Sequence, residues 1–114
     1  MADEVAYINF DEGVGRVMNN AKLYVKLLAK FKSDTNMEGL RAALAAGDME
    51  TAQTYAHTVK GIAANLSLME LFKQMLELEN QIKARAVDSG QVEMVKNVFE
   101  ATVQEVDRVM AQYG

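Results

Sequence analysis

The chain contains no proline among its 114 residues. Proline breaks helices in their interior, because it lacks a backbone N–H and its ring clashes with the preceding turn, so a chain without it can form long uninterrupted helices. Alanine, leucine, lysine, glutamate and methionine, which are good helix formers, are plentiful. No segment alternates polar and apolar residues as a half-buried strand would. The sequence therefore predicts an all-α fold.

Apolar residues that recur every three to four positions, with turn residues between the runs, predict six helices. We expect them at about 11–18, 21–32, 37–46, 49–66, 68–86 and 91–113. Short connections favour antiparallel neighbours. The three long helices and the helix at 21–32 therefore predict an antiparallel, up-and-down four-helix bundle, and the two shorter helices would cover one end or edge.

Length and charge narrow the function. A chain of 114 residues suffices for one domain, taken as 1–114 with a core of about 10–113. The formal net charge of −4, without a long basic cluster, weighs against nucleic acid and anionic membranes as partners. No apolar run approaches the ~20 residues needed to span a bilayer. The acidic start, Met1-Ala2-Asp3-Glu4, does not resemble a secretory signal. We expect a cytoplasmic monomer.

His57 is the only histidine, and the chain has no cysteine. Imidazole is the side chain that normally titrates near neutral pH, so His57 is the first candidate for chemistry. On a helical wheel, His57 lies roughly 160° from Val59, which centres the apolar stripe, and it should face outward. A single histidine without cysteine provides no typical metal-ligand set, so we expect no metal site.

Two small residues, Gly61 and Ala64, follow His57 on the same outward face of the helix, next to Lys60. A glycine inside a helix costs about 1 kcal/mol relative to alanine, and close approach of another surface is the usual reason for one. A docked partner could bring a phosphoryl group to the imidazole while Lys60 neutralises its oxygens. The pattern alone fits equally well a surface histidine without a function, beside a glycine that only accommodates packing.

Glu79 should lie level with His57 in the hairpin formed by the predicted helices at 49–66 and 68–86. Each residue is eleven positions from Leu68, near the turn, so both should lie roughly 16 Å from it. A carboxylate that accepts a hydrogen bond from Nδ1 would fix the imidazole tautomer and leave Nε2 as the nucleophile. A solvated charge in a glutamate-rich helix is the alternative.

These residues resemble the histidine-containing phosphotransfer (HPt) domains of bacterial multistep two-component signalling. The segment Ala56-His57-Thr58-Val59-Lys60-Gly61 is close to the family's A-H-x-L-K-G core. Further similar positions are Ala63, Asn65, Leu66, Leu78-Glu79, Gly47-Asp48 and the early segment 11–31, so the resemblance covers about 10–113. Two positions depart from it, since Ala64 and Ser67 stand where the family usually has glycine.

The resemblance implies a phosphorelay intermediate. Nε2 of His57 would accept a phosphoryl group from an aspartyl phosphate on a receiver domain and pass it to another receiver, without kinase activity of its own. Lys60 would offset phosphate charge and Glu79 would orient the imidazole. The partners would be response-regulator receiver domains, a hybrid sensor histidine kinase, or both. No cofactor is expected, because the receiver would supply Mg²⁺. The expected docking residues are Gln53, Gly61, Ala64, Phe72 and Leu76.

Two alternatives remain. The chain could be the phosphoaccepting domain of a chemotaxis-type histidine kinase, since such domains also place a glutamate where Glu79 stands, although the free ends favour a standalone relay. It could also be a non-catalytic helical interaction module whose eight methionines form an adaptable surface. The spacing of Met75, Met94 and Met110 instead predicts that these methionines lie in the core.

Overall fold

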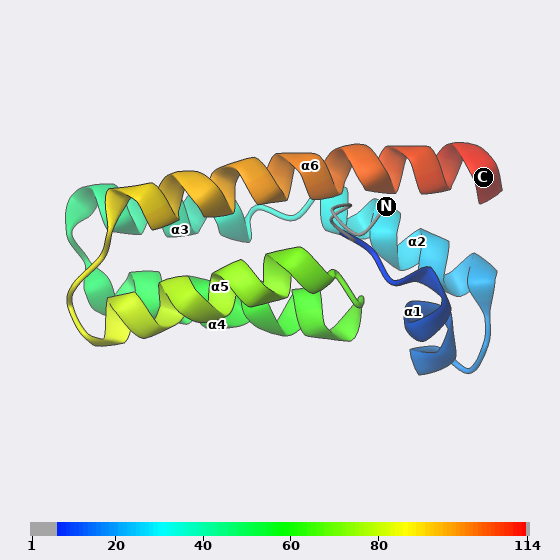
Figure 1. Ribbon diagram of the computed structural model, residues 1–114, viewed down its shortest axis with the longest axis horizontal. Helices are drawn as coiled ribbons and strands as arrows, with labels where there is room; N and C mark the ends of the chain where they lie inside the picture. Colours follow the sequence, from blue (N-terminus) through cyan, green and yellow to red (C-terminus); the bar gives the residue numbers. More distant parts are fainter. Residues whose placement is uncertain (1–6, 114) are drawn as a thin grey trace, which may run out of the picture.

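The computed structural model describes residues 7–113, and every regular element in that range is an α-helix (Figure 1). The helices are α1 (Phe10–Arg16), α2 (Ala21–Lys32), α3 (Asn36–Ala46), α4 (Met49–Asn65), α5 (Met69–Lys83) and α6 (Ser89–Tyr113). The prediction of an all-α bundle is confirmed. The predicted helix bounds differ from the observed ones by at most three residues.

Side-chain caps explain where several helices begin. Asn9, Asn20 and Asp48 each accept a hydrogen bond from the backbone N–H three residues on. Such caps satisfy N–H groups that have no partner inside the helix. Gly47 ends α3 with a φ of 72°, in the left-handed region that glycine adopts without a side-chain clash. The turn Gly47-Asp48 therefore stops one helix and starts the helix that carries His57.

Four columns of helix build the bundle. α4 packs against α3 and α5, while α6 packs against α5 and α2. α2 and α3 follow one another along the length of α6, so together they fill the fourth column (Figure 1). The expectation that the helix at 37–46 merely covers an edge needs correction. It packs directly on α4, because Gly39 lets the ring of Tyr55 lie where a Cβ atom would otherwise stand.

Small side chains line the buried face of α4. Ala52, Ala56 and Ala63 are fully buried, and such short side chains let neighbouring helices approach closely. α5 contributes larger buried residues to the same core: Leu71, Met75, Leu78 and Ile82. Met94 does not join the core as expected. It is 46% exposed, because α6 buries the stripe of Val95, Val98, Thr102, Val106 and Val109 instead.

The segment before α1 is tied to the turn between α4 and α5. The N–H of Asn9 donates to the carbonyl of Ser67 at 3.0 Å, and the N–H of Met69 donates to the carbonyl of Tyr7 at 3.0 Å. The Ser67 hydroxyl donates to Oε1 of Glu12 at 2.7 Å, and the buried Tyr24 hydroxyl donates to the Leu66 carbonyl. These bonds fix the end of the bundle that lies beyond His57.

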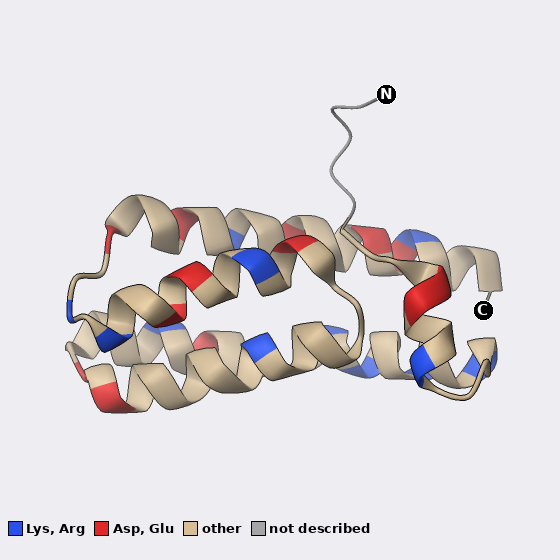
Figure 2. Cartoon of the chain, turned by 60° about the horizontal axis from the view of Figure 1, so that its bottom comes forward, with Lys and Arg blue, Asp and Glu red and all other residues tan. Residues whose placement is uncertain are grey.

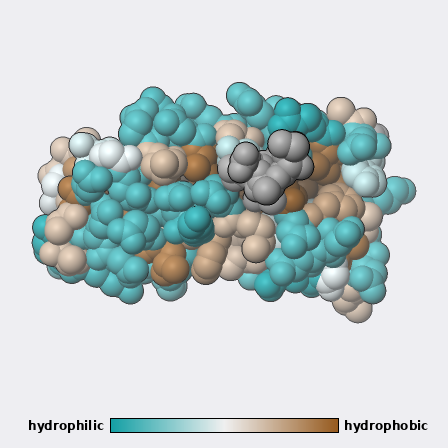
Figure 3. Space-filling model, in the orientation of Figure 1, coloured by the Kyte–Doolittle hydropathy of each residue, from teal (hydrophilic) through white to brown (hydrophobic). Residues whose placement is uncertain are grey.

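The surface carries mixed charges and small apolar patches. Basic and acidic residues are interspersed over most of the helices, whereas the charged residues of α2 are all lysines (Figure 2). Hydrophilic residues dominate the face seen in Figure 3, and the apolar patches on it are separate. None of the helices of residues 7–113 is long and apolar enough to cross a membrane.

Candidate functional site

His57 projects from the outer face of α4, and its side chain is 71% exposed. Its neighbours one position before and two positions after, Ala56 and Val59, are buried. The outward direction predicted from the helical wheel is therefore correct. Because α4 is held by α3 on one side and α5 on the other, the imidazole stands on a firmly packed helix.

Glu79 reaches His57 from α5. Its Oε2 atom lies 3.3 Å from Nδ1 of His57, and its side chain is only 2% exposed. The hairpin geometry predicted this pair correctly, because α4 and α5 are antiparallel and their turn is midway between the two residues. When Nδ1 carries the proton and donates it to Oε2, the lone pair of Nε2 is left facing outward.

Two lysines share the carboxylate of Glu79 with His57. Nζ of Lys60 lies 2.7 Å from Oε1, and Nζ of Lys83 lies 3.5 Å from Oε2. The contact between Lys60 and Oε1 is an ion pair with a buried carboxylate. Lys83 was not among the site residues predicted from the sequence. Its position four residues after Glu79, on the same helix face, could have identified it.

These cations keep Glu79 ionised. Burial by itself raises the pKa of a carboxyl group. Here the Lys60 ammonium, the hydrogen bond with His57 and the charge of Lys83 outweigh burial, so the pKa of Glu79 lies below its ordinary value of 4.5. The site therefore presents a buried negative charge beneath an exposed imidazole near neutral pH.

His57 lines one side of an open depression of about 590 Å³. Its lining residues are Glu50, Gln53, Thr54, His57, Thr58, Glu79 and Lys83. The expected docking residue Gln53 thus lines the same depression as His57, whereas Lys60 does not line it. An exposed, uncharged imidazole with an oriented ring can act as a nucleophile or exchange a proton.

The Hpt domain family model matches residues 27–112 of the chain. The chain belongs to the Hpt domain family. Comparisons with curated proteins and with solved structures gave no significant match. Hpt domains act in histidine phosphotransfer within two-component signalling, and they typically interact with receiver domains and kinases.

The glycines of this Hpt domain fall into two groups. A Cβ atom at Gly39 would lie 2.4 Å from the Tyr55 ring, and one at Gly13 would lie 2.2 Å from the Tyr24 ring. These two positions need glycine for internal packing. A Cβ atom at Gly61 would meet nothing within 4 Å. The fold within residues 7–113 therefore gives no packing reason for Gly61, one turn along from His57.

The remaining docking candidates lie toward the α4–α5 turn. Ala64 and Phe72 line a hollow of about 190 Å³ that α1 borders with Glu12 and Arg16. Phe72 is partly buried there, whereas Leu76 is 41% exposed. The structure thus places Ala64, Phe72 and Leu76 along α4 and α5, away from the depression that contains Gln53.

Ser67 occupies a position where the family usually has glycine. Its φ of +57° is in the left-handed region, which explains a preference for glycine. The serine adopts this conformation while its hydroxyl bonds to Glu12. The turn therefore accommodates serine in place of the family's usual glycine.

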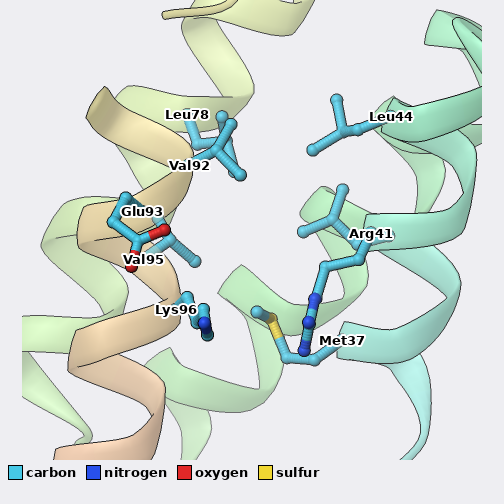
Figure 4. A pocket seen from close by; sticks show the side chains of 9 residues that line it. Met37, Arg41, Leu44, Leu78, Val92, Glu93, Val95 and Lys96 are labelled. Carbon is cyan, nitrogen blue, oxygen red and sulfur yellow. The ribbon is translucent and has the colours of Figure 1, made fainter. Parts of the chain in front are cut away.

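A third cavity, between α3 and α6, has a different lining (Figure 4). It has a volume of about 190 Å³ and a mainly apolar floor that includes Met37, Leu40 and Val95. Arg41 and Lys96 stand among the lining residues, but no histidine does. His57, the only histidine of the chain, lies instead where α4 meets α5.

Proposed function

We propose that this Hpt domain is a phosphorelay intermediate that accepts a phosphoryl group on His57 and passes it to a receiver domain. One observation carries the proposal. The exposed imidazole has its Nδ1 atom 3.3 Å from a buried carboxylate, which leaves Nε2 open to a partner. The family gives the class of reaction.

The donor in this proposal is an aspartyl phosphate on a receiver domain. Nε2 of neutral His57 attacks phosphorus in line with the leaving carboxylate oxygen. The N–P bond forms as the P–O bond breaks, and the electron pair of that bond leaves with the aspartate. The Nδ1 proton stays on the ring, so the product is a phosphoimidazolium. Transfer to the second receiver is the same step in reverse.

Glu79 and Lys60 have separate roles in this step. The Glu79 carboxylate holds the Nδ1 proton and stabilises positive charge as the ring is phosphorylated, as expected of a charge-assisted hydrogen bond. Lys60 keeps that carboxylate ionised through its 2.7 Å contact. Its ammonium also offsets charge on the transferred phosphoryl group when a partner is bound.

The proposed docking face runs along α4 and α5 on both sides of His57. Gln53 supplies a polar contact, the open sites at Gly61 and Ala64 admit a close approach, and Phe72 and Leu76 supply apolar contact. A receiver domain that docks there would bring its own Mg²⁺. This chain supplies the imidazole and its orientation.

The test is transfer from a phosphorylated receiver domain. Isotope label should move to the wild-type protein, survive base and be lost in acid, as phosphohistidine behaves. His57→Gln should take up no label. Absence of label on the wild type with every cognate receiver would refute the relay, and label on His57→Gln would refute the site. Lys60→Ala should remain folded but accept the phosphoryl group more slowly; transfer at the wild-type rate would refute its assigned role.

A second donor has one observation in its favour. The carboxylate at position 79 is also the group found in the phosphoaccepting domains of chemotaxis-type kinases. In that case an ATP-binding kinase domain, rather than a receiver, would phosphorylate His57. Incubation with ATP and the cognate kinase domain, in parallel with the phosphorylated receiver, separates the two donors.

A further inference from the structure

The Glu79 carboxylate contacts His57, Lys60 and Lys83, and the proposed mechanism gives no role to the contact with Lys83. Its Nζ atom lies 3.5 Å from Oε2, the same oxygen that lies 3.3 Å from Nδ1 of His57. Lys60, by contrast, pairs with Oε1. A single carboxylate oxygen therefore faces both the imidazole and a second ammonium group.

The exposure of the two lysines also differs. The side chain of Lys83 is 51% exposed and lines the depression around His57, whereas that of Lys60 is 21% exposed and does not. An ordinary pair of glutamate and lysine four residues apart on a helix surface contributes little to helix stability. Here the glutamate is buried and bonded to the imidazole, so the same pairing acts on the reactive group.

We propose that Lys83 is a positioning residue for phosphotransfer, which acts through Oε2 of Glu79 to limit how strongly the carboxylate favours a protonated His57. This inference rests on the proposed function of His57. The ammonium and the ring Nδ1–H draw on the same oxygen, and the positive charge of Lys83 disfavours a second positive charge on the ring. Through Oε2, Lys83 therefore opposes protonation of Nε2, which would remove the lone pair that attacks phosphorus.

The charges around His57 make this effect specific to Lys83. From α4, Glu50 lines the depression and Lys60 is fixed on the opposite oxygen. From α5, Glu79 and Lys83 face the ring. Removal of Lys83 leaves Lys60 as the one cation paired with Glu79 among the described residues.

The experiment compares Lys83→Met, Lys83→Arg and the control Lys73→Met, which removes an exposed lysine from the same helix. A small phosphodonor such as phosphoramidate phosphorylates His57 without a docked partner. In Lys83→Met, the acid limb of the pH–rate profile should move to higher pH by about half a unit. This is the size expected when one charge at roughly 7 Å from the ring is removed in a high-dielectric environment. Lys83→Arg should restore the wild-type profile, and Lys73→Met should leave it unchanged.

A second readout does not depend on phosphorylation. His57 is the only histidine, so its ring-proton NMR signal is unambiguous, and the midpoint of its pH titration should move in the same direction in Lys83→Met. In a Glu79→Gln background the shift should be smaller. If folded Lys83→Met shows the wild-type NMR titration midpoint and the wild-type pH–rate profile, the inference is wrong, while the proposed relay is unaffected. An effect seen only with the receiver would overturn it in favour of a docking contact. If wild-type His57 takes up no label from any receiver, the relay fails, and the NMR titration still decides the role of Lys83.

Discussion

Nδ1 of His57 and Oε2 of Glu79 lie 3.3 Å apart, although 22 positions of sequence separate the two residues. The antiparallel pairing of α4 and α5 brings them together, and burial of the carboxylate strengthens the contact, because little water competes for it. The first prediction tests this pair directly.

Glu79→Gln should slow phosphotransfer to His57 roughly tenfold, since a charged acceptor is exchanged for a neutral one of the same shape. The rate of label transfer from a phosphorylated receiver measures this. Glu77→Gln is the matched control, because Glu77 is an exposed glutamate on the same helix and its loss should leave the rate unchanged. Equal rates for both variants and the wild type would contradict the role of Glu79.

The same carboxylate should make the fold sensitive to acid. The pKa of Glu79 is lower in the folded protein than its ordinary value of 4.5. Its contribution to stability is therefore fully present above about pH 4.5 and is lost as the pH falls through the folded pKa. Urea unfolding at pH 7 and at pH 3 should show a smaller loss of unfolding free energy on acidification for Glu79→Gln than for the wild type. An identical loss would show that Glu79 is not the titrating group.

Gly61→Ala and Gly39→Ala should change stability in opposite directions. Alanine at position 61 meets no neighbour, so it should raise the free energy of unfolding by up to about 1 kcal/mol through better helix propensity. Alanine at position 39 would clash with the Tyr55 ring and should lower it by about 1–3 kcal/mol. Thermal and urea unfolding of the two variants measure both effects.

Transfer rates separate the docking role of Gly61 from its effect on the helix. Gly61→Leu should slow transfer from the receiver but not phosphorylation by phosphoramidate, because only the receiver needs the open surface. Equal slowing of both reactions would indicate damage to His57 itself, and an unchanged receiver rate would remove Gly61 from the docking face.

Tyr24→Phe should lower the unfolding free energy by about 1 kcal/mol at neutral pH, since the Leu66 carbonyl loses its donor. Burial, with a smaller contribution from Glu12, raises the pKa of Tyr24 from 10.0 to about 12. A raised pKa gives stability that is present below pH 10 and is lost as the pH rises toward 12. The wild type should therefore weaken more than Tyr24→Phe between these values in urea unfolding. Parallel curves would contradict the burial argument.

The helices, the turns between them and the His57–Glu79 pair were predictable, because they depend on local residue chemistry or on spacing along the chain. Asp48 and Gly47 mark a helix start and end by local chemistry, and equal distances from the turn align two residues of a hairpin. The packing of α3 on α4 was not predictable in this way. It depends on Gly39 admitting the Tyr55 ring, a contact between two helices that no period within one helix reveals.

The candidate site, too, could be predicted from the sequence only in part. Lys83 was missed because a lysine four residues after a glutamate is common on solvated helices. Its proposed role depends on the burial of Glu79, which its distance from the turn does not reveal. Met94 was expected in the core for a similar reason. Its spacing fits a stripe that α6 does not bury.

His57 stands on the ridge of a helix and not at the bottom of a cleft. A projecting side chain can supply a reacting atom but cannot enclose it. In the proposed relay, the concave half of the active site thus belongs to the partner, which closes over the imidazole and removes water only while the two proteins are joined. Between encounters the phosphorylated ring would stand in open solvent, without the partner's residues around the phosphorus. The transferred group should then outlast each complex and travel with the chain.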